Sequence, residues 1–118
     1  MHPDLSLALA LADLADSISL PRFRALDARV ETKPDLTPVT DVDRGIERAL
    51  RERIEQERPG AVVLGEELGG PSAGGGERWI VDPIDGTRNF VRGIPIYATL
   101  VALQRDGDVV VGWGWIAA

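Results

Sequence analysis

Two aspartates follow a short apolar segment in residues 79–90, and their spacing suits a metal site. The β-compatible residues 79–81 predict a short buried strand, which Pro83 is expected to end because it fixes φ and lacks a backbone donor. Asp82 and Asp85 lie three residues apart across the expected turn, so both carboxylates can converge on one cation.

The same segment also has the features of an anion site. Gly86 lets the backbone approach a ligand closely, and Thr87 offers a hydroxyl and an N–H where a short helix can begin. Asp-Pro and Asp-Gly are also ordinary turn dipeptides. The two acids, together with Thr87 and Asn89, exceed what a plain loop requires, which favours a metal and phosphate site.

Composition narrows the chemistry to carboxylates. The chain has no cysteine, and its one histidine, His2, lies near a chain end. Cysteine phosphatases, phosphohistidine mechanisms, thiolate zinc sites and Ser-His-Asp triads are therefore unsupported. Oxygen ligands favour hard cations, which makes Mg²⁺ the expected metal, with Mn²⁺ as an alternative.

The charge balance bears on possible partners. Thirteen Lys and Arg residues against nineteen Asp and Glu residues give a net charge of −6, and no basic run suggests nucleic acid. A phosphate can approach such a protein where divalent cations lie between it and the carboxylates. Residues 5–14 are far shorter than the roughly 20 residues of a membrane span, and no signal-peptide pattern is present. We therefore expect a cytoplasmic protein with a single domain and no membrane partner.

The amino-terminal region predicts a helix followed by a short strand. Apolar residues recur at helical spacing after Asp4, which is expected to cap the helix, and Pro21 is expected to end or kink it. Residues 29–33 have strand character, and residues 34–38 form a polar loop.

A second helix is predicted from a capping box formed by Thr40 and Asp43. Its apolar stripe consists of Val42, Ile46, Leu50 and Ile54. Glu47, Arg51 and Glu55 are expected to form ion pairs on a solvated outer face. From the sequence alone, Asp41 is best explained as an acid favoured by the helix dipole.

The carboxy-terminal part predicts further strands. Residues 61–64 form a short buried strand followed by Gly65, Glu66 and Glu67, and the Gly-rich residues 69–76 lack the Lys-Ser/Thr of a P-loop. Residues 97–104 and 109–116 are predicted strands of a hairpin that turns at Asp106-Gly107. The expected fold is α+β, with two helices packed on a largely antiparallel β-sheet.

These motifs resemble the inositol monophosphatase family of magnesium-dependent phosphatases. Residues 65–67 and 79–90 are similar to its two acidic signatures, and Thr40-Asp41 is similar to its third. The order of elements resembles the amino-terminal half of that fold. Within the family, residues 33–41 and 89–95 look most like the histidinol-phosphate phosphatase branch.

The resemblance implies a role for each matching residue. Glu66, Asp82 and the carbonyl of Ile84 would hold a first metal, and Asp82 with Asp85 would hold part of a second. The N–H groups of Gly86 and Thr87 would bind the phosphate. The Thr87 hydroxyl and Asp41 would position and help to deprotonate the attacking water.

The implied function is Mg²⁺-dependent hydrolysis of a small phosphorylated metabolite, with histidinol phosphate as the leading substrate, in a protein that forms a homodimer when intact. Inositol monophosphate and other sugar or nucleotide phosphates are alternatives within this class. Family members continue into a second half that supplies a further metal ligand. Residues 1–118 are therefore expected to be the metal-binding amino-terminal domain of a truncated copy, and an inactive metal-binding remnant or assembly module is a further alternative.

Overall fold

The computed structural model describes residues 1–70 and 76–116, except the side chains of Trp113, Trp115 and Ile116. Most of the Gly-rich segment predicted over residues 69–76 thus lies outside the described residues. The order of strands in the main sheet is β3-β4-β5-β6, with β3 parallel to β4 and the other neighbours antiparallel. The main elements are α1 (Pro3–Ala25), α2 (Asp41–Glu57), β3 (Val62–Gly65), β4 (Glu77–Asp85), β5 (Ala98–Arg105) and β6 (Asp108–Ile116). The predicted α+β fold is confirmed.

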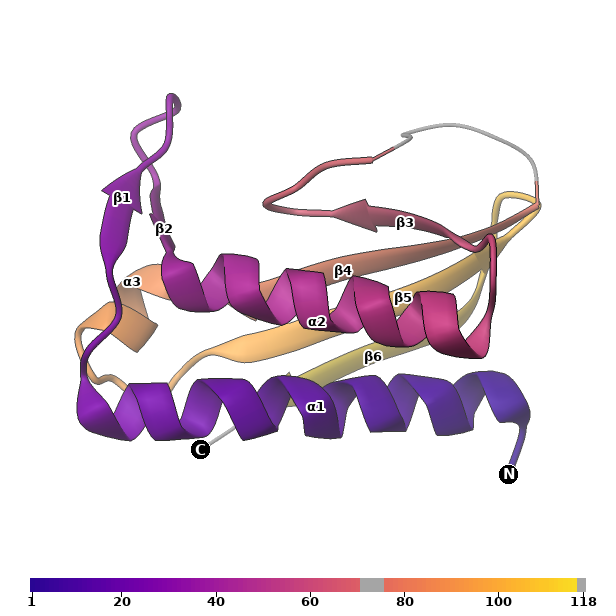
Figure 1. Cartoon of the computed structure of the whole chain (residues 1–118), viewed down its shortest axis with the longest axis horizontal. Helices are drawn as coiled ribbons and strands as arrows, with labels where there is room; N and C mark the ends of the chain where they lie inside the picture. Colours follow the sequence, from indigo (N-terminus) through magenta and orange to yellow (C-terminus); the bar gives the residue numbers. More distant parts are fainter. Residues whose placement is uncertain (71–75, 117–118) are drawn as a thin grey trace.

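Helices α1 and α2 lie side by side across one face of this sheet (Figure 1). The predicted stripe of α2 supplies the centre of the core, because each of its four side chains is at most 1% exposed. Trp79 and Val81 of β4 and Val101 and Leu103 of β5 belong to the same core cluster. The alternation of these residues along the strands directs every second side chain toward the helices. None of the described helices combines the length and apolarity needed to cross a bilayer.

Helix α1 differs from the prediction at its amino terminus, and of the two outcomes expected at Pro21 it does not show an end. His2 is its N-cap and accepts a hydrogen bond from the Asp4 N–H through Nδ1 at 3.1 Å, whereas Asp4 itself is buried inside the first turn. The helix does not end at Pro21 but continues to Ala25. Phe23, beyond the proline, packs against Phe90 and Tyr97 with ring centroids 5.7 and 5.3 Å away. These contacts favour the last turn despite the backbone bond that a proline removes.

A two-stranded ribbon lies at one end of α2 (Figure 1). It consists of β1 (Val30–Thr32) and the antiparallel β2 (Pro38–Thr40), so the strand predicted over residues 29–33 is present, and β2 was not anticipated. Thr40 ends β2 and caps α2, and the predicted capping box with Asp43 is confirmed.

Strand β4 does not end at Pro83 but runs on to Asp85. Its pairing with β5 shifts register between Asp82 and Asp85, so the proline lies in an irregular stretch where its missing donor does not interrupt the ladder. The buried Thr99 hydroxyl donates to the Pro83 carbonyl at 2.9 Å. The strand therefore contains both aspartates, which lie toward its carboxyl end.

Two turns form as the sequence predicts. Helix α3 (Thr87–Val91) begins directly after Gly86, whose φ of 95° strongly favours glycine. The β5–β6 hairpin turns at Asp106 and Gly107, both with positive φ.

Candidate functional site

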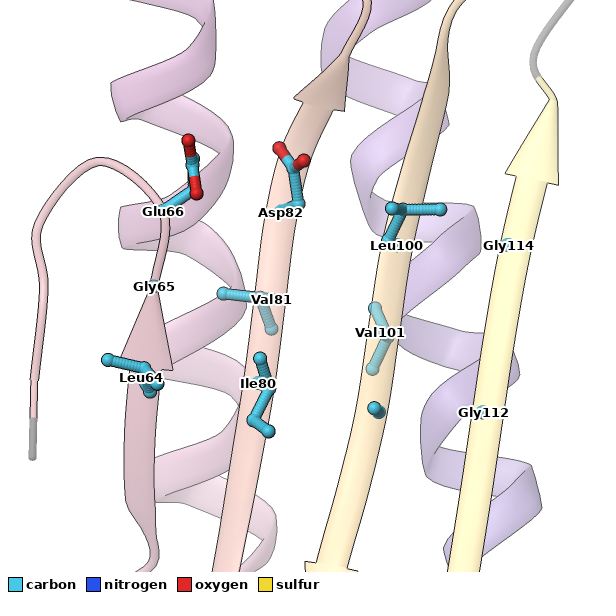
Figure 2. Close-up of a pocket in the computed structure, with 11 residues that line it drawn as sticks. Leu64, Gly65, Glu66, Ile80, Val81, Asp82, Leu100, Val101, Gly112 and Gly114 are labelled. Atoms are coloured by element: carbon cyan, nitrogen blue, oxygen red, sulfur yellow. The ribbon is translucent and has the colours of Figure 1, made fainter. Parts of the chain in front are cut away.

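Parallel pairing of β3 with β4 brings two acids together on the carboxyl-terminal side of these strands. Gly65 is in register with Val81, and the Glu66 N–H donates to the Val81 carbonyl at 3.0 Å. Glu66 directly follows β3 and Asp82 lies within β4, and Figure 2 shows their side chains side by side. The register of these two strands thus places the two acids next to each other.

Two hollows adjoin these acids. One, of about 480 Å³, lies on the face of the sheet opposite the helices, between Leu64, Ile80 and Leu100 (Figure 2). The other, of about 290 Å³, is strongly polar. Its lining residues are Lys33, Asp35, Thr37, Pro38, Glu66, Glu67, Asp82, Ile84, Asp85, Gly86, Thr87, Arg88 and Asn89. The structure thus brings all the predicted metal and phosphate residues into one cavity.

Asp82 has the electrostatics of a cation ligand. Burial, followed by the negative charges of Glu66, Asp85, Glu67 and Asp43, raises its pKa to about 7. Its Oδ1 is buried and has no hydrogen-bond partner within the part of the chain that the structure describes. A divalent cation would satisfy this oxygen and offset the repulsion, so the donor set fits a hard metal ion.

The other predicted ligands differ from this carboxylate in their exposure and hydrogen bonding. Asp85 is exposed, and Ile84 is buried with its carbonyl 3.2 Å from the Thr87 Oγ1, which donates to it. Among residues 1–70 and 76–116, no three Asp, Glu or His side chains already form a group that could hold a metal ion. Metal binding would therefore require these side chains to draw closer together.

Thr87 is paired with Asp43 rather than with Asp41. The Thr87 Oγ1 donates to the Asp43 Oδ1 at 2.9 Å. The other carboxylate oxygen of Asp43 accepts from the Thr40 N–H at 2.9 Å and from the Thr40 hydroxyl. Asp43 is fully buried, and these bonds hold it in one orientation.

Asp41 points away from the cavity into a different set of contacts. Its carboxylate accepts from Arg22 at 2.9 Å and from the Arg29 N–H at 2.7 Å. Burial would raise the pKa of Asp41, but these bonds outweigh it and hold the pKa below the usual value. The expected pairing of Asp41 with Thr87 is not observed. The sequence did contain a signal, since Asp43 lies on the helical face of Ile46 and Leu50.

Lys33 and Glu67 also belong to the site, although the sequence assigned no role to them. The Lys33 ammonium lies 3.5 Å from Glu67 and 3.8 Å from Glu66. Burial raises the pKa of Glu67, whose side chain is only 4% exposed, and Lys33 opposes this effect. Lys33 places a positive charge beside the acids in the absence of a metal.

The prediction that Glu47 lies on the solvated outer face of α2 is wrong. This side chain is fully buried, because it faces the segment that follows β3. Arg51 does pair with Glu47, but Glu55 accepts from the Gly60 N–H instead of from Arg51.

Sequence comparison identifies a family and individual proteins to which this chain is similar. The model of the inositol monophosphatase family matches residues 2–116. A histidinol-phosphatase of Mycobacterium tuberculosis is 60% identical over 111 residues, which cover 94% of this chain and 43% of that protein. An inositol-1-monophosphatase of Mycobacterium leprae is 54% identical over 80 residues, covering 64% of this chain and 28% of that protein. The chain thus spans less than half the length of these relatives.

Structural comparison agrees. The extragenic suppressor protein suhB of Bartonella henselae superposes with a TM-score of 0.89 at 28% identity, covering 98% of this chain and 46% of that one. Because the family model matches nearly the whole chain, the protein belongs to the inositol monophosphatase family.

Proposed function

We propose that the site carried by this chain hydrolyses phosphate monoesters with the help of Mg²⁺. The observation that carries the proposal is the buried Oδ1 of Asp82, which has no hydrogen-bond partner among the described residues. Four other carboxylates raise the pKa of Asp82, and one of them, Asp43, is paired with Thr87. A carboxylate with a pKa of about 7 is poised to exchange a proton for a cation near neutral pH.

Three residues would hold a first metal, and a bound Mg²⁺ would neutralise the phosphate charge and lower the pKa of the attacking water. These three are Glu66, Asp82 and, through its carbonyl, Ile84. Asp82 and Asp85 would contribute to a second site, with Mn²⁺ as the alternative ion. The carboxylates would hold the metal in a polar cavity whose volume suits a small substrate.

The remaining residues would orient the reacting groups. The N–H groups of Gly86 and Thr87 would receive phosphate oxygens, since the amino-terminal N–H groups of a helix lack partners within that helix. The Thr87 hydroxyl is fixed by Asp43 and can accept a hydrogen bond from a water molecule at the same time. We assign to Asp43 the role that the resemblance implied for Asp41, because Asp43 contacts Thr87 and Asp41 contacts Arg22 instead.

Histidinol phosphate is the proposed substrate, because the histidinol-phosphatase of Mycobacterium tuberculosis matches 94% of the chain. Inositol monophosphate is the alternative, favoured by the Mycobacterium leprae relative. Homodimer formation and a cytoplasmic location stay predictions.

The test is release of inorganic phosphate from histidinol phosphate and inositol 1-phosphate, with and without Mg²⁺. We expect Mg²⁺-dependent turnover with a higher kcat/KM for histidinol phosphate, and loss of turnover in Asp82→Asn. Mg²⁺ binding without turnover of either ester would support the alternative of a metal-binding module. Turnover that persists in a chelator would contradict the metal-dependent proposal.

A further inference from the structure

Glu47 is a buried carboxylate whose contacts are with the segment that carries Glu66. Its Oε1 accepts from the Glu67 N–H at 2.8 Å, and its Oε2 accepts from the Leu68 N–H at 2.8 Å. Its side chain has no exposed surface. A fully buried carboxylate is costly unless it is satisfied, and here two adjacent peptide groups satisfy it.

Gly65 shows how closely this carboxylate is seated. A Cβ added at Gly65 would lie 2.2 Å from the Glu47 Cδ and 2.3 Å from each carboxylate oxygen. Only a residue without a side chain leaves room for Glu47 at this position. The space in front of Gly65 is therefore occupied by the carboxylate itself.

Arg51 completes the arrangement one turn later on α2. Its Nε donates to Glu47 Oε2 at 3.2 Å, and its two terminal nitrogens donate to the carbonyls of Val63 and Gly69. Gly69 and Gly65 also exchange both backbone hydrogen bonds, at 2.9 and 3.0 Å. The segment from Gly65 to Gly69 is thus closed on itself and tied to α2 by one acid and one base.

We propose that Glu47 is a positioning residue for the metal site, which fixes Glu66 by binding the two peptide N–H groups that follow it. The inference rests on the proposed function, because Glu66 is there a metal ligand. The Glu66 side chain is 55% exposed and lies 3.8 Å from the end of the flexible Lys33 side chain, so its direction depends strongly on the backbone. The Glu66 N–H donates to the Val81 carbonyl of β4, and the Glu67 and Leu68 N–H groups donate to Glu47. Together these bonds fix the backbone at Glu66 and directly after it.

This role also explains why Glu47 lies one turn after Asp43 on α2. Residues four apart share a helix face, so the same face contacts Thr87 through Asp43 and the Glu66 segment through Glu47. A single rigid helix would then set the distance between the group that orients water and a metal ligand.

The first measurement needs no metal. In Glu47→Gln, one oxygen is replaced by an NH₂ group that faces a peptide N–H, so the amides of Glu67 and Leu68 should exchange hydrogen faster, while those of the α2 core keep their rates. The same variant should bind Mg²⁺ about tenfold or more weakly by calorimetry, as substitutions behind a metal ligand commonly do.

Two controls separate positioning from charge and from stability. Glu52→Gln removes the same charge from the exposed side of α2 and should leave both readouts unchanged. Ile54→Val destabilises the core at the far end of the helix and should lower the melting temperature without weakening Mg²⁺ binding.

Gly65→Ala supplies a test that alters no charge. Its methyl group should displace the Glu47 carboxylate, speed exchange at Glu67 and Leu68, and weaken Mg²⁺ binding to a similar extent. In a Glu47→Ala background the space is free, so Gly65→Ala should then have little further effect on Mg²⁺ affinity.

The outcomes distinguish the two proposals. Mg²⁺ binding that is lost in Asp82→Asn but unaffected by Glu47→Gln would overturn the role of Glu47 and leave the proposed function intact. A wild-type protein that binds no Mg²⁺ would overturn both, and unchanged exchange at Glu67 and Leu68 would overturn the positioning role alone. Additive effects of Gly65→Ala and Glu47→Ala on Mg²⁺ affinity would also contradict the positioning role of Glu47.

Discussion

The Thr87 hydroxyl and the Asp43 carboxylate lie 2.9 Å apart although 44 positions separate them in the sequence. Asp43 enters the site from the first turn of α2, and Thr87 enters it from the first residue of α3. The contact joins the helical layer to the edge of the sheet where Asp82 and Asp85 lie.

Asp43→Asn is expected to lower kcat by about 10²-fold or more, because the amide is a poorer proton acceptor for the Thr87 hydroxyl. Asp41→Asn should change kcat by no more than a few-fold, since Asp41 contacts Arg22 and Arg29 instead. Steady-state kinetics with histidinol phosphate, together with Mg²⁺ affinity, provides the measurement. Equal losses of kcat in the two variants would return Asp41 to the site.

Asp82→Asn should weaken Mg²⁺ binding more than Asp85→Asn does. Asp82 is proposed to contact both metals and is partly buried among other acids, whereas Asp85 is exposed. Calorimetric titration of each variant with Mg²⁺ and with Zn²⁺ provides the comparison. Zn²⁺ binding that is tight and insensitive to both substitutions would argue against an oxygen-ligand site.

In the metal-free protein, the contribution of Asp82 to stability should fall as pH rises from about 4 to about 7. The pKa of Asp82 is 3.8 in the unfolded reference and about 7 in the fold, so the folded state retains the proton that the unfolded chain releases. Asp82→Asn should therefore be more stable than the wild type at about pH 8 and similar to it at about pH 4. Thermal melts at both pH values, in the presence of a chelator, measure this.

Added Mg²⁺ should reverse the effect in the wild type, because it stabilises the ionised carboxylate. The Asn variant should respond much less. If the wild type and Asp82→Asn show the same dependence of melting temperature on pH over this interval, the pKa of Asp82 is not raised in the fold.

Asp4→Asn should destabilise the fold by about 1.5–3 kcal/mol, because it removes charge-assisted hydrogen bonds. The Asp4 carboxylate accepts from Arg58 at 2.7 Å and from Arg105 at 2.7 and 3.0 Å, which links α1 to the end of α2 and to β5. Urea unfolding measures the loss. Asp13→Asn, on the exposed side of the same helix, is the matched control.

The same acid predicts a loss of stability at low pH. Hydrogen bonds from Arg105 lower the pKa of Asp4 most, burial opposes them, and Arg58 adds to the lowering, giving a pKa of about 2. The contribution of Asp4 to stability is thus present above its unfolded pKa of 3.8 and is lost as pH falls toward 2. Asp4→Asn should show a smaller change across this interval.

Local rules predicted much of the fold. The stripe of α2, its capping box and the Asp106-Gly107 turn each depend on side-chain spacing and turn chemistry over a few residues. Residue types pointed to Asp82 and Asp85, and the family resemblance added Glu66, so three of the acids that line the polar cavity were identified. The position of Glu66 beside Asp82, however, required the parallel register of β3 and β4, which no local pattern specifies.

Two misjudged residues have one physical cause in common. Pro83 and Glu47 were assigned from local preference, whereas tertiary contacts determine what each does; the role of Asp41 came instead from the family resemblance. Pro83 lies in a register shift of β4, and contacts of Phe23 hold the turn beyond Pro21. Glu47 has the sequence spacing of a surface ion pair with Arg51, but the peptide groups it binds lie about twenty residues further on.

Asp43 and Glu47 occupy the inward side of α2, where a helix that packs on a sheet ordinarily carries aliphatic residues. An aliphatic residue at position 43 would remove the capping box, and one at position 47 would leave the Glu67 and Leu68 N–H groups without their acceptor, so replacing either acid would lower stability as well as remove a contact to the site. Engineering of this helix should hold these two positions fixed and place stabilising changes on its exposed face.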